Sequence, residues 1–459
     1  MSAKPSSLPT RVEAMSADLR GRILAGQLAP ADRLPSVRAL ARSRNVSPFT
    51  AARVYELLVA EGLIEARRGS GYYVARDADA FGARHLAAAE PLVDSIWGLR
   101  RDYDGTALQV DAGCGWLPPQ WLFADGVRAA LTQVARRPSV YAGRYGSSYG
   151  LRALRHHLAR QLTLRGVECA EEQIVLTQGA SQALELAICA LSSPGEAVLV
   201  DDPGYPYVLA MLRARGCRPV GVPRTDRGPD AAALARLAAE TRARLFITNT
   251  TYQNPTGTTT CAQTAHALLR VAEQHGLTIC EDDIFAELSP ERTTPLASLD
   301  RLERVIYIGS FSKTIAPSLR VGYLAARADR AEHMARLKNV MSLSSSELME
   351  HIVLAILTSG RHRTHLERLR QRIGEARASL SHRLREAGIE VSARTGGMFL
   401  WAKLPGEPAQ LLRRAKAQGI LLAPGELFSP QEQPSGHWRF NVAYADDERL
   451  YGFLKALPG

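Results

Sequence analysis

Short apolar runs rich in β-branched residues recur along the last three quarters of the chain, and helical patterns separate several of them. Alternation of strands with helices predicts a mostly parallel sheet covered by helices on both faces, which is an α/β architecture. From Leu411 onward the two patterns mix again, which indicates a smaller C-terminal lobe. The predicted strands are 173–177, 197–200, 245–248, 277–280 and 305–308, and the predicted helices include 181–191 and 261–275.

The chain has 459 residues, a length that predicts two or three folding units. Hydrophobic residues make up 46% and charged residues 22%, as in ordinary soluble proteins, and a net charge of +11 permits binding to a polyanion. The six cysteines are scattered without a CxxC pair, which fits a reducing cytosol and favours no metal site. Because the sequence shows neither a bilayer-length apolar run nor the apolar segment of a signal peptide, we expect a cytoplasmic protein without a membrane anchor.

The first 75 residues have a different pattern, in which short helices precede a β-hairpin. Gly26 and Pro30 end the first helix, Ser36 opens the second, and Ser47-Pro48 opens the third. Three helices and a hairpin form a winged helix-turn-helix, whose third helix enters the major groove of DNA. The predicted elements are helices 11–26, 37–43 and 48–61, and strands 63–68 and 72–74 joined by a glycine turn.

The charge of this segment supports DNA binding. Residues 1–75 contain eleven Lys and Arg against six Asp and Glu, a net charge of +5. Positive side chains at phosphates provide affinity for nucleic acid. The arginines expected on the second and third helices and on the wing are Arg38, Arg42, Arg44, Arg53, Arg67 and Arg68.

A specific set of residues is dispersed over the same segment, including Leu34-Pro35-Ser36, Leu40-Ala41, Glu61-Gly62 and Gly69-Ser70-Gly71. On these residues the segment resembles the GntR family of bacterial regulators. The alternative interpretation is a three-helix protein-interaction module with incidental basic residues. The resemblance implies a double-stranded DNA operator as partner, contacted by Arg38, Ser47, Thr50, Arg53 and Ser70.

Residues 76–108 change character, because an alanine-rich stretch interrupts the periods of the flanking segments. We interpret them as a linker between a DNA-binding domain at 1–75 and a large domain at 109–459. For the C-terminal part of this stretch, an irregular first segment of the large domain is the alternative.

Polar motifs follow several predicted strands, at the edge where parallel sheets bind ligands. Taken singly, each motif also fits an ordinary turn. In the last one, Gly309-Ser310-Phe311-Ser312-Lys313, a lysine lies among hydroxyls and Arg320 follows, which suits a Schiff base to an aldehyde that carries a phosphate. The motifs are at 178–182, 202–206, 254–257, 281–283 and 309–313.

In their order and spacing the motifs resemble the class I aminotransferases of fold type I. The resemblance implies pyridoxal phosphate as cofactor, joined to Lys313 by a Schiff base. It further implies that Asp282 pairs with the ring nitrogen, that Asn254 hydrogen-bonds the ring hydroxyl and that Tyr205 stacks on the ring.

The same resemblance assigns residues to the phosphate, the partner subunit and the substrate. Tyr145 matches a tyrosine that reaches the phosphate from the partner subunit, which implies a homodimer. Arg439 matches the arginine that binds a substrate α-carboxylate, a bidentate task suited to guanidinium. The other residues expected to bind the cofactor, chiefly at its phosphate, are Ser181, Gln182, Ser310, Ser312 and Arg320.

One position departs from the aminotransferase pattern. The family usually has a tyrosine three residues after the aspartate, where this chain has Phe285. Phenylalanine cannot donate a hydrogen bond to the ring hydroxyl, which argues against an efficient transaminase more than against cofactor binding. Asp283 is an alternative to Asp282 as the partner of the ring nitrogen.

Together the two halves resemble the MocR group of transcription regulators, whose large domain senses pyridoxal phosphate, alone or joined to an amino compound, as a dimer. The resemblance implies that an amino acid or amine displaces Lys313, and that the external aldimine changes the spacing of paired winged helices on DNA. The main alternative is an active aminotransferase carrying a DNA-binding head, which Lys313, Asp282 and Arg439 allow. A lyase or decarboxylase would need other groups around the substrate α-carbon, and none is identified.

Overall fold

A computed structural model describes residues 11–24, 28, 31–60, 63–67, 70–75, 109–137, 139, 143, 145–291, 293–391 and 395–457. The chain divides into two compact units, Met1–Ala89 and Glu90–Gly459. The predicted linker at 76–108 lies outside the described residues, as do the predicted helix ends at Gly26, Pro30 and Gly62 and the wing residues Arg68 and Gly69.

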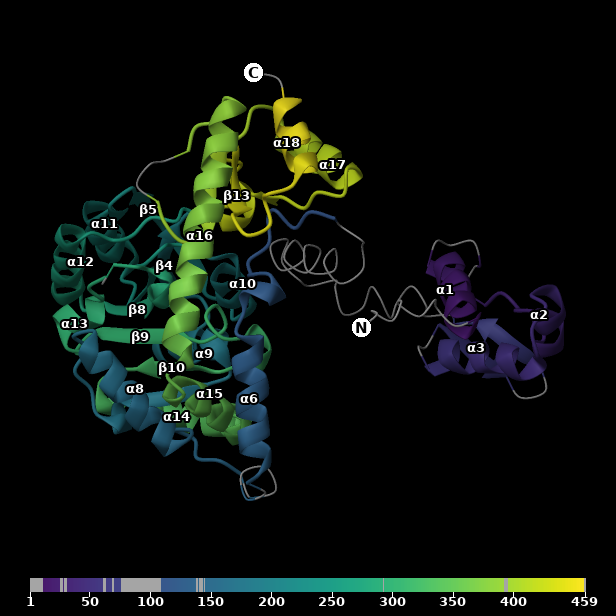
Figure 1. Ribbon diagram of the computed structural model, residues 1–459, viewed down its shortest axis with the longest axis horizontal. Coiled ribbons are helices and arrows are strands. Elements are labelled where there is room, and N and C mark those ends of the chain that lie inside the picture. Colours follow the sequence, from purple (N-terminus) through teal and green to yellow (C-terminus); the bar gives the residue numbers. More distant parts are fainter. Residues whose placement is uncertain are drawn as a thin grey trace. The chain divides into compact units, whose positions relative to one another are not determined.

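The N-terminal unit is a winged helix-turn-helix, as predicted (Figure 1). The Ser36 hydroxyl caps the second helix by accepting a hydrogen bond from the Ala39 amide at 3.2 Å, and Ser47 caps the third through the Thr50 amide at 3.0 Å. The elements are α1 (Arg11–Leu24), α2 (Val37–Ser43), α3 (Pro48–Ala60) and the antiparallel strands β1 (Ile64–Arg67) and β2 (Gly71–Val74).

A small apolar core joins the helices to the wing. Tyr55 of α3 is fully buried, and its hydroxyl donates to the Pro35 carbonyl at 2.7 Å. Its ring packs against Tyr72 of β2 with centroids 4.6 Å apart. Leu40, Val54 and Leu58 are buried beside it, which confirms the predicted inner faces of α2 and α3. The outer face of α3 is therefore left for a partner.

The described part of the C-terminal unit is organised around an eight-stranded sheet in the order β3-β10-β9-β8-β7-β4-β5-β6. The strands from β5 through β4, β7 and β8 to β9 run parallel, whereas β3, β10 and β6 are antiparallel to their neighbours. The strands are β3 (Ile174–Thr177), β4 (Ala197–Asp202), β5 (Arg218–Thr225), β6 (Gly228–Pro229), β7 (Leu245–Asn249), β8 (Thr278–Asp282), β9 (Val305–Ser310) and β10 (Gly322–Ala325).

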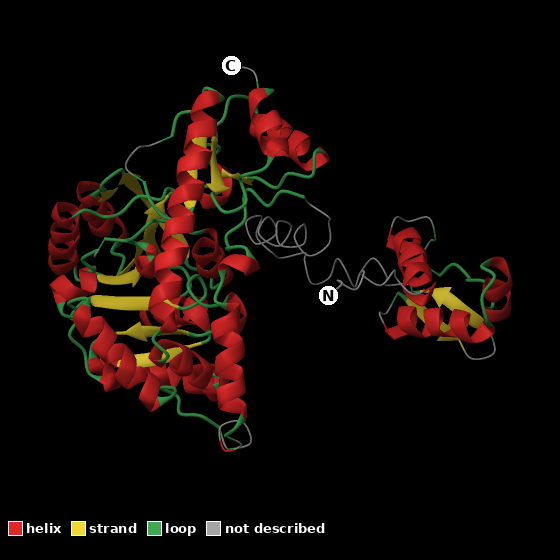
Figure 2. Ribbon diagram, in the orientation of Figure 1, coloured by secondary structure: helices red, strands yellow, loops and turns green. Residues whose placement is uncertain are grey.

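Helices cover both faces of this sheet, which confirms the predicted α/β architecture (Figure 2). On one face the buried apolar residues come from α6 (Ala124–Ala135), α8 (Arg152–Leu164), α11 (Ala231–Thr241), α12 (Ala262–His275) and α15 (Glu347–Thr358). On the other they come from α9 (Gly179–Leu191), α10 (Pro206–Ala214) and α14 (Ala328–Ser342). A sheet buried on both faces explains its continuous apolar strands.

A smaller lobe follows the long helix α16 (Arg361–Glu386), which runs from α15 to that lobe (Figure 1). The lobe contains a three-stranded sheet in the order β11-β13-β12. It begins earlier than Leu411, where the sequence pattern placed it, because β11 precedes that residue and pairs along its whole length with β13. The elements are β11 (Phe399–Lys403), α17 (Pro408–Ala417), β12 (Ala423–Pro424), β13 (His437–Asn441) and α18 (Glu448–Lys455).

Candidate functional site

A cavity of about 360 Å³ lies at the carboxyl ends of the parallel strands, where open α/β sheets bind ligands. Segments far apart in the sequence meet there because each polar motif follows its own strand. Of the eleven residues predicted to bind cofactor or carboxylate, nine line this one space. They are Ser181, Tyr205, Asn254, Asp282, Ser310, Ser312, Lys313, Arg320 and Arg439.

Lys313 follows β9 and presents its amine inside the cavity. Its Nζ donates a hydrogen bond to the Gly115 carbonyl at 2.7 Å. Burial lowers the pKa of this amine to about 8. Nearly all lysines are fully protonated at neutral pH, whereas Lys313 is poised to supply a neutral, nucleophilic amine.

Asp282 ends β8, and one oxygen of its buried carboxyl group has no partner among the described residues. The residue is 4% exposed, and Oδ1 makes no hydrogen bond to any residue that the structure describes. Burial raises the pKa of this carboxyl to about 7. A buried acceptor without a partner is costly, so the group is well suited to a ligand that brings a hydrogen-bond donor.

The lining of the cavity also combines hydroxyls, a guanidinium and a helix N-terminus. Arg320, in a left-handed conformation with φ of 51°, donates from Nη2 to the Gln178 carbonyl at 3.0 Å. Gly179 has a φ of 74°, which favours glycine where α9 begins, and a Cβ there would also lie 2.6 Å from that guanidinium. The Ser310 and Ser312 hydroxyls lie 3.1 Å apart. This combination of hydrogen-bond donors and positive charge fits a phosphate group.

Arg439 enters the cavity from β13 of the smaller lobe. Its Nη1 donates to Asn254 Oδ1 at 2.9 Å and its Nη2 to the Gly113 carbonyl at 2.6 Å. The guanidinium also lies over the rings of Phe399 and Phe428, with 4.6 Å and 5.0 Å to the ring centroids. It is therefore oriented by both lobes and faces the space where a carboxylate could bind.

Two residues predicted to bind the cofactor, Gln182 and Tyr145, do not line this cavity, and neither does Asp283, the alternative to Asp282. The Gln182 side chain is engaged elsewhere: its Oε1 accepts a hydrogen bond from the Gln178 backbone amide at 2.8 Å, and its Nε2 donates to Ser342 Oγ at 3.0 Å. Tyr145 is 82% exposed, and its expected role towards a partner subunit stays a prediction. Asp283 accepts a hydrogen bond from Arg165 at 2.8 Å in a different cavity, since neighbouring strand residues point to opposite faces.

Other residues of the site carry no recognisable motif. Trp116 lines the cavity from a loop, Tyr207 from the first turn of α10, and Phe428 from a short 3-10 helix, Gly425–Phe428. Phe285 also lines it and packs edge-on against Phe399, with centroids 5.8 Å apart at 85°. Only the deviation of Phe285 from the aminotransferase pattern could be seen in the sequence, because the other contacts depend on how distant loops meet.

The predicted DNA-contacting residues lie on the N-terminal unit. Arg38, Thr50 and Arg53 are exposed or half-buried on α2 and α3, and Arg53 pairs with Glu56 at 2.9 Å on the surface. The hydroxyls of Ser47 and Thr50 lie 2.8 Å apart at the N-terminus of α3. Ser70, in the wing, is hydrogen-bonded to the Tyr73 hydroxyl at 2.6 Å.

The fold and the two sites define a DNA-binding regulator that is joined to an aminotransferase-like domain. The chain belongs to the aminotransferase class I and II family, which matches residues 127–457, and residues 11–74 match the bacterial regulatory proteins of the gntR family. This combination confirms the predicted relation to MocR-type regulators.

Relatives with known names show the same combination. The uncharacterized HTH-type transcriptional regulator YdcR of Escherichia coli K12 is 30% identical, over 97% of this chain and 98% of its own length. A protein of Rhizobium meliloti named probable rhizopine catabolism regulatory protein MocR is 31% identical, over 88% of this chain and 84% of its own.

Among solved structures, the large unit resembles the α-aminoadipate aminotransferase LysN of Thermus thermophilus, in complex with N-(5'-phosphopyridoxyl)-L-leucine. The TM-score is 0.69 at 27% identity, and the match covers 75% of this chain and 90% of LysN. In the part of the chain that the structure describes, no helix is long and apolar enough to cross a membrane.

Proposed function

We propose that this protein is a homodimeric transcription regulator that binds pyridoxal phosphate at Lys313 and senses an amino compound in the same cavity. The observation that best supports this is the convergence of nine expected residues on one cavity, in a chain that also carries a winged helix-turn-helix. The comparison with LysN is in line with it, because that enzyme was solved with a cofactor–amino acid adduct.

The residues of the cavity fit pyridoxal phosphate. Asp282 Oδ1, which is buried and lacks a described partner, would accept a hydrogen bond from the protonated ring nitrogen. Arg320, Ser310 and Ser312 would hold the phosphate beside Gly179. The group, when bound, supplies an electrophilic aldehyde that reacts with primary amines.

The protein's own residues prepare the site for an amino compound. Lys313 offers an amine whose lowered pKa keeps a substantial fraction neutral near physiological pH. Arg439 binds a carboxylate by exchanging its contacts with Asn254 and Gly113 for the new anion. Such a ligand changes DNA binding only to the extent that it binds two arrangements of the dimer differently.

Phe285 favours a sensor over an efficient aminotransferase. Its ring lies in the site against Phe399 and brings no hydroxyl. Asn254 is then the side chain left to hydrogen-bond the ring hydroxyl of the cofactor, and its Oδ1 is engaged by Arg439.

The visible absorption spectrum of protein reconstituted with pyridoxal phosphate tests the cofactor site, with Lys313→Ala as the control. We expect a visible band that the variant lacks. Titration with amino acids and amines then separates the two functions. A lasting shift with one compound supports a sensor, whereas conversion to the pyridoxamine form with release of keto acid would show a working transaminase.

DNA binding is tested separately by removing residues 1–75 and selecting bound sequences from a random duplex pool with the full chain. We expect the full chain to enrich a motif with two half-sites and the truncated protein to enrich none. Equal binding by the truncated protein would refute the assignment of the N-terminal unit.

A further inference from the structure

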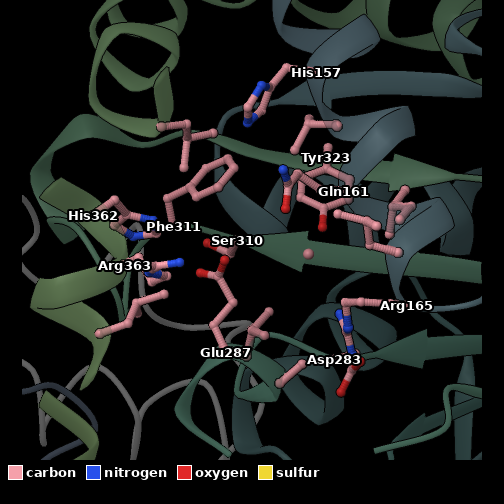
Figure 3. Close-up of a pocket in the computed structure, with 18 of the residues that line it drawn as sticks. His157, Gln161, Arg165, Asp283, Glu287, Ser310, Phe311, Tyr323, His362 and Arg363 are labelled. Carbon is pink, nitrogen blue, oxygen red and sulfur yellow. Dashed lines mark hydrogen bonds and ion pairs between the residues drawn. The ribbon is translucent and has the colours of Figure 1, made fainter. Parts of the chain in front are cut away.

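A second cavity, of about 510 Å³, lies against β9 and β10 on the side of the sheet covered by α8 (Figure 3). Its walls are β9, β10, the C-terminal part of α8, the segment 283–287 and the start of α16 as far as Arg370. It is separate from the cofactor cavity but shares Ser310 and Ile284 with it. No residue proposed above to bind DNA or an effector needs this space.

Two buried polar atoms in this cavity have no partner among the residues that the structure describes. His362 is 7% exposed, and its Nε2 makes no hydrogen bond to the residues that the structure describes. Asp283 is 3% exposed, and its Oδ1 is likewise unpaired there, although Oδ2 accepts from Arg165 at 2.8 Å and from the Tyr307 hydroxyl at 3.1 Å. Buried polar groups are nearly always paired, so both atoms point to a missing ligand.

The charges of the lining indicate the sign of that ligand. The lining carries three arginines (Arg165, Arg363 and Arg370) against two acids (Asp283 and Glu287), a net positive charge. Arg165 is paired with Asp283 at 2.8 Å, and Arg363, whose side chain is 89% exposed, lies 3.9 Å from Glu367 outside the lining, where solvent weakens the ion pair. Both acids already accept hydrogen bonds, Glu287 from the Thr314 hydroxyl at 2.9 Å. A ligand with one negative charge would balance the cavity.

The first turn of α16 forms the anion-binding end. Gly360 precedes this 26-residue helix without a side-chain cap, and the turn contains no acidic residue. The amide groups of this turn carry positive partial charge, although the Arg361 amide already donates to Ser359 Oγ at 3.3 Å. In Figure 3, His362 and Arg363 lie at this end, and Arg165 and Asp283 lie together at the other.

Between the two ends the walls combine apolar and aromatic side chains (Phe311, Tyr323, Leu158 and Leu366) with the polar side chains of Gln161, Ser310 and Glu287. We propose that this cavity binds a small monocarboxylic acid with an apolar or aromatic body and a hydrogen-bond donor at its far end. The carboxylate contacts Arg363, His362 and the N-terminus of α16, and the donor contacts Asp283 Oδ1. Since Ser310 borders both cavities, occupancy would also act on the cofactor site, a consequence that depends on the proposed function.

The test is isothermal titration calorimetry of the full, cofactor-treated chain with para-hydroxyphenylacetate, which has these three features. Phenylacetate lacks the far donor, and para-hydroxyphenylacetamide lacks the charge. We expect each analogue to bind at least about tenfold more weakly than the probe, the usual effect of losing one charge-assisted or buried hydrogen bond. Failure of the probe to bind at millimolar concentration, or equal binding of all three, would overturn the proposal.

Substitutions in and near the second cavity test whether the probe binds there. Arg363→Ala should weaken the probe at least about tenfold, whereas Arg361→Ala, an exposed arginine of the same turn that does not line the cavity, should leave affinity within about twofold. Gln161→Trp should block the cavity from an exposed position, with Arg160→Trp as its matched control. Binding that survives both cavity variants but is lost in Arg439→Ala would place the probe in the cofactor cavity and refute the second site.

Discussion

Lys313 and Asp282 are buried in one cavity, and burial moves both pKa values towards neutrality. The pKa of the lysine falls from an ordinary 10.5 to about 8, and that of the aspartate rises from 3.8 to about 7. These shifts come from desolvation, which disfavours the charged form of either group. A site that combines a lysine whose pKa is lowered to about 8 with an unsatisfied buried carboxyl is chemically unusual, and it suits an aldehyde attached to a protonated ring.

The lowered pKa of Lys313 predicts how cofactor uptake depends on pH. Only the neutral amine attacks an aldehyde, so the rate of uptake should rise about tenfold per pH unit below pH 8 and level off above it. Stopped-flow absorbance after mixing apoprotein with pyridoxal phosphate measures this rate. A rate that continues to rise up to pH 10.5 would show that the amine is not perturbed.

Phe49 is an apolar side chain on the DNA-binding surface. It is 83% exposed at the first turn of α3, next to the Ser47–Thr50 pair. An exposed phenylalanine at the N-terminal end of a recognition helix can contact a thymine methyl group in the major groove. We therefore assign it to base recognition and not to the core.

Phe49→Ala should weaken binding to the selected DNA sequence about tenfold and relax preference at one T·A position, since one base contact contributes about 1–3 kcal/mol. Fluorescence anisotropy with the selected duplex and with single-base variants measures both effects. Val59→Ala, near the other end of α3, is the control and should bind like wild type. Unchanged base preference in Phe49→Ala would contradict the assignment.

Among the elements, β4, β5 and β7 are joined at their carboxyl ends by a buried ion pair. Arg224 of β5 lies 3.0 Å from Asp201 of β4, and their side chains are 1% and 4% exposed. Asp201 also accepts hydrogen bonds from the Thr248 hydroxyl at 2.9 Å and the Asn249 amide at 3.0 Å in β7. Burial raises the pKa of Asp201, and Arg224 opposes that rise.

Arg224→Ala would leave the Asp201 charge buried without a counter-ion, and we expect a loss of about 3–5 kcal/mol in unfolding free energy. The pKa of Asp201 in the folded variant would rise further above its unfolded value. A raised folded pKa favours folding at low pH, so the loss should be smaller at about pH 5 than at about pH 8. Urea unfolding at both pH values tests this. Arg227→Ala, an exposed neighbour, should cost less than about 1 kcal/mol.

At the scale of the whole molecule, one exposed apolar surface is a candidate subunit interface. Val340, at the end of α14, is 85% exposed, and Met341 and Leu343 next to it are also exposed. The Ser148 hydroxyl donates to Asn339 Oδ1 at 3.0 Å, which ties the segment carrying Tyr145 to this end of α14. Contiguous exposed apolar side chains are typical of interaction surfaces.

If this surface joins two copies, Val340→Asp should raise the dissociation constant of the dimer at least about tenfold, because it buries a charge against apolar side chains. Analytical ultracentrifugation over a concentration series measures the effect. Leu412→Asp, on α17, is the control and should leave the association unchanged. A variant that stays dimeric at all concentrations would place the interface elsewhere.

Local patterns in the sequence were sufficient for much of the fold. The caps at Ser36 and Ser47 and the apolar faces of α2 and α3 act within a few residues, and they determined the winged helix-turn-helix. The apolar strands β3, β4, β7, β8 and β9 were equally readable because a sheet buried on both faces requires continuous apolar runs. β5 was missed, since Pro219, Gly221 and Pro223 interrupt the usual strand composition.

In the candidate site too, some features could be predicted from the sequence and others depended on the tertiary structure. Lys313, Asp282 and Arg439 could be proposed from motifs, because each reactive group needs a particular residue type at a particular strand end. Only the tertiary structure decided that Asp282 and not Asp283 faces the cofactor cavity, that Gln182 turns away from it, and that His362 and Asp283 share a second cavity. Residue type and spacing act along the chain, whereas burial, pairing and the side of a sheet depend on contacts between segments hundreds of residues apart.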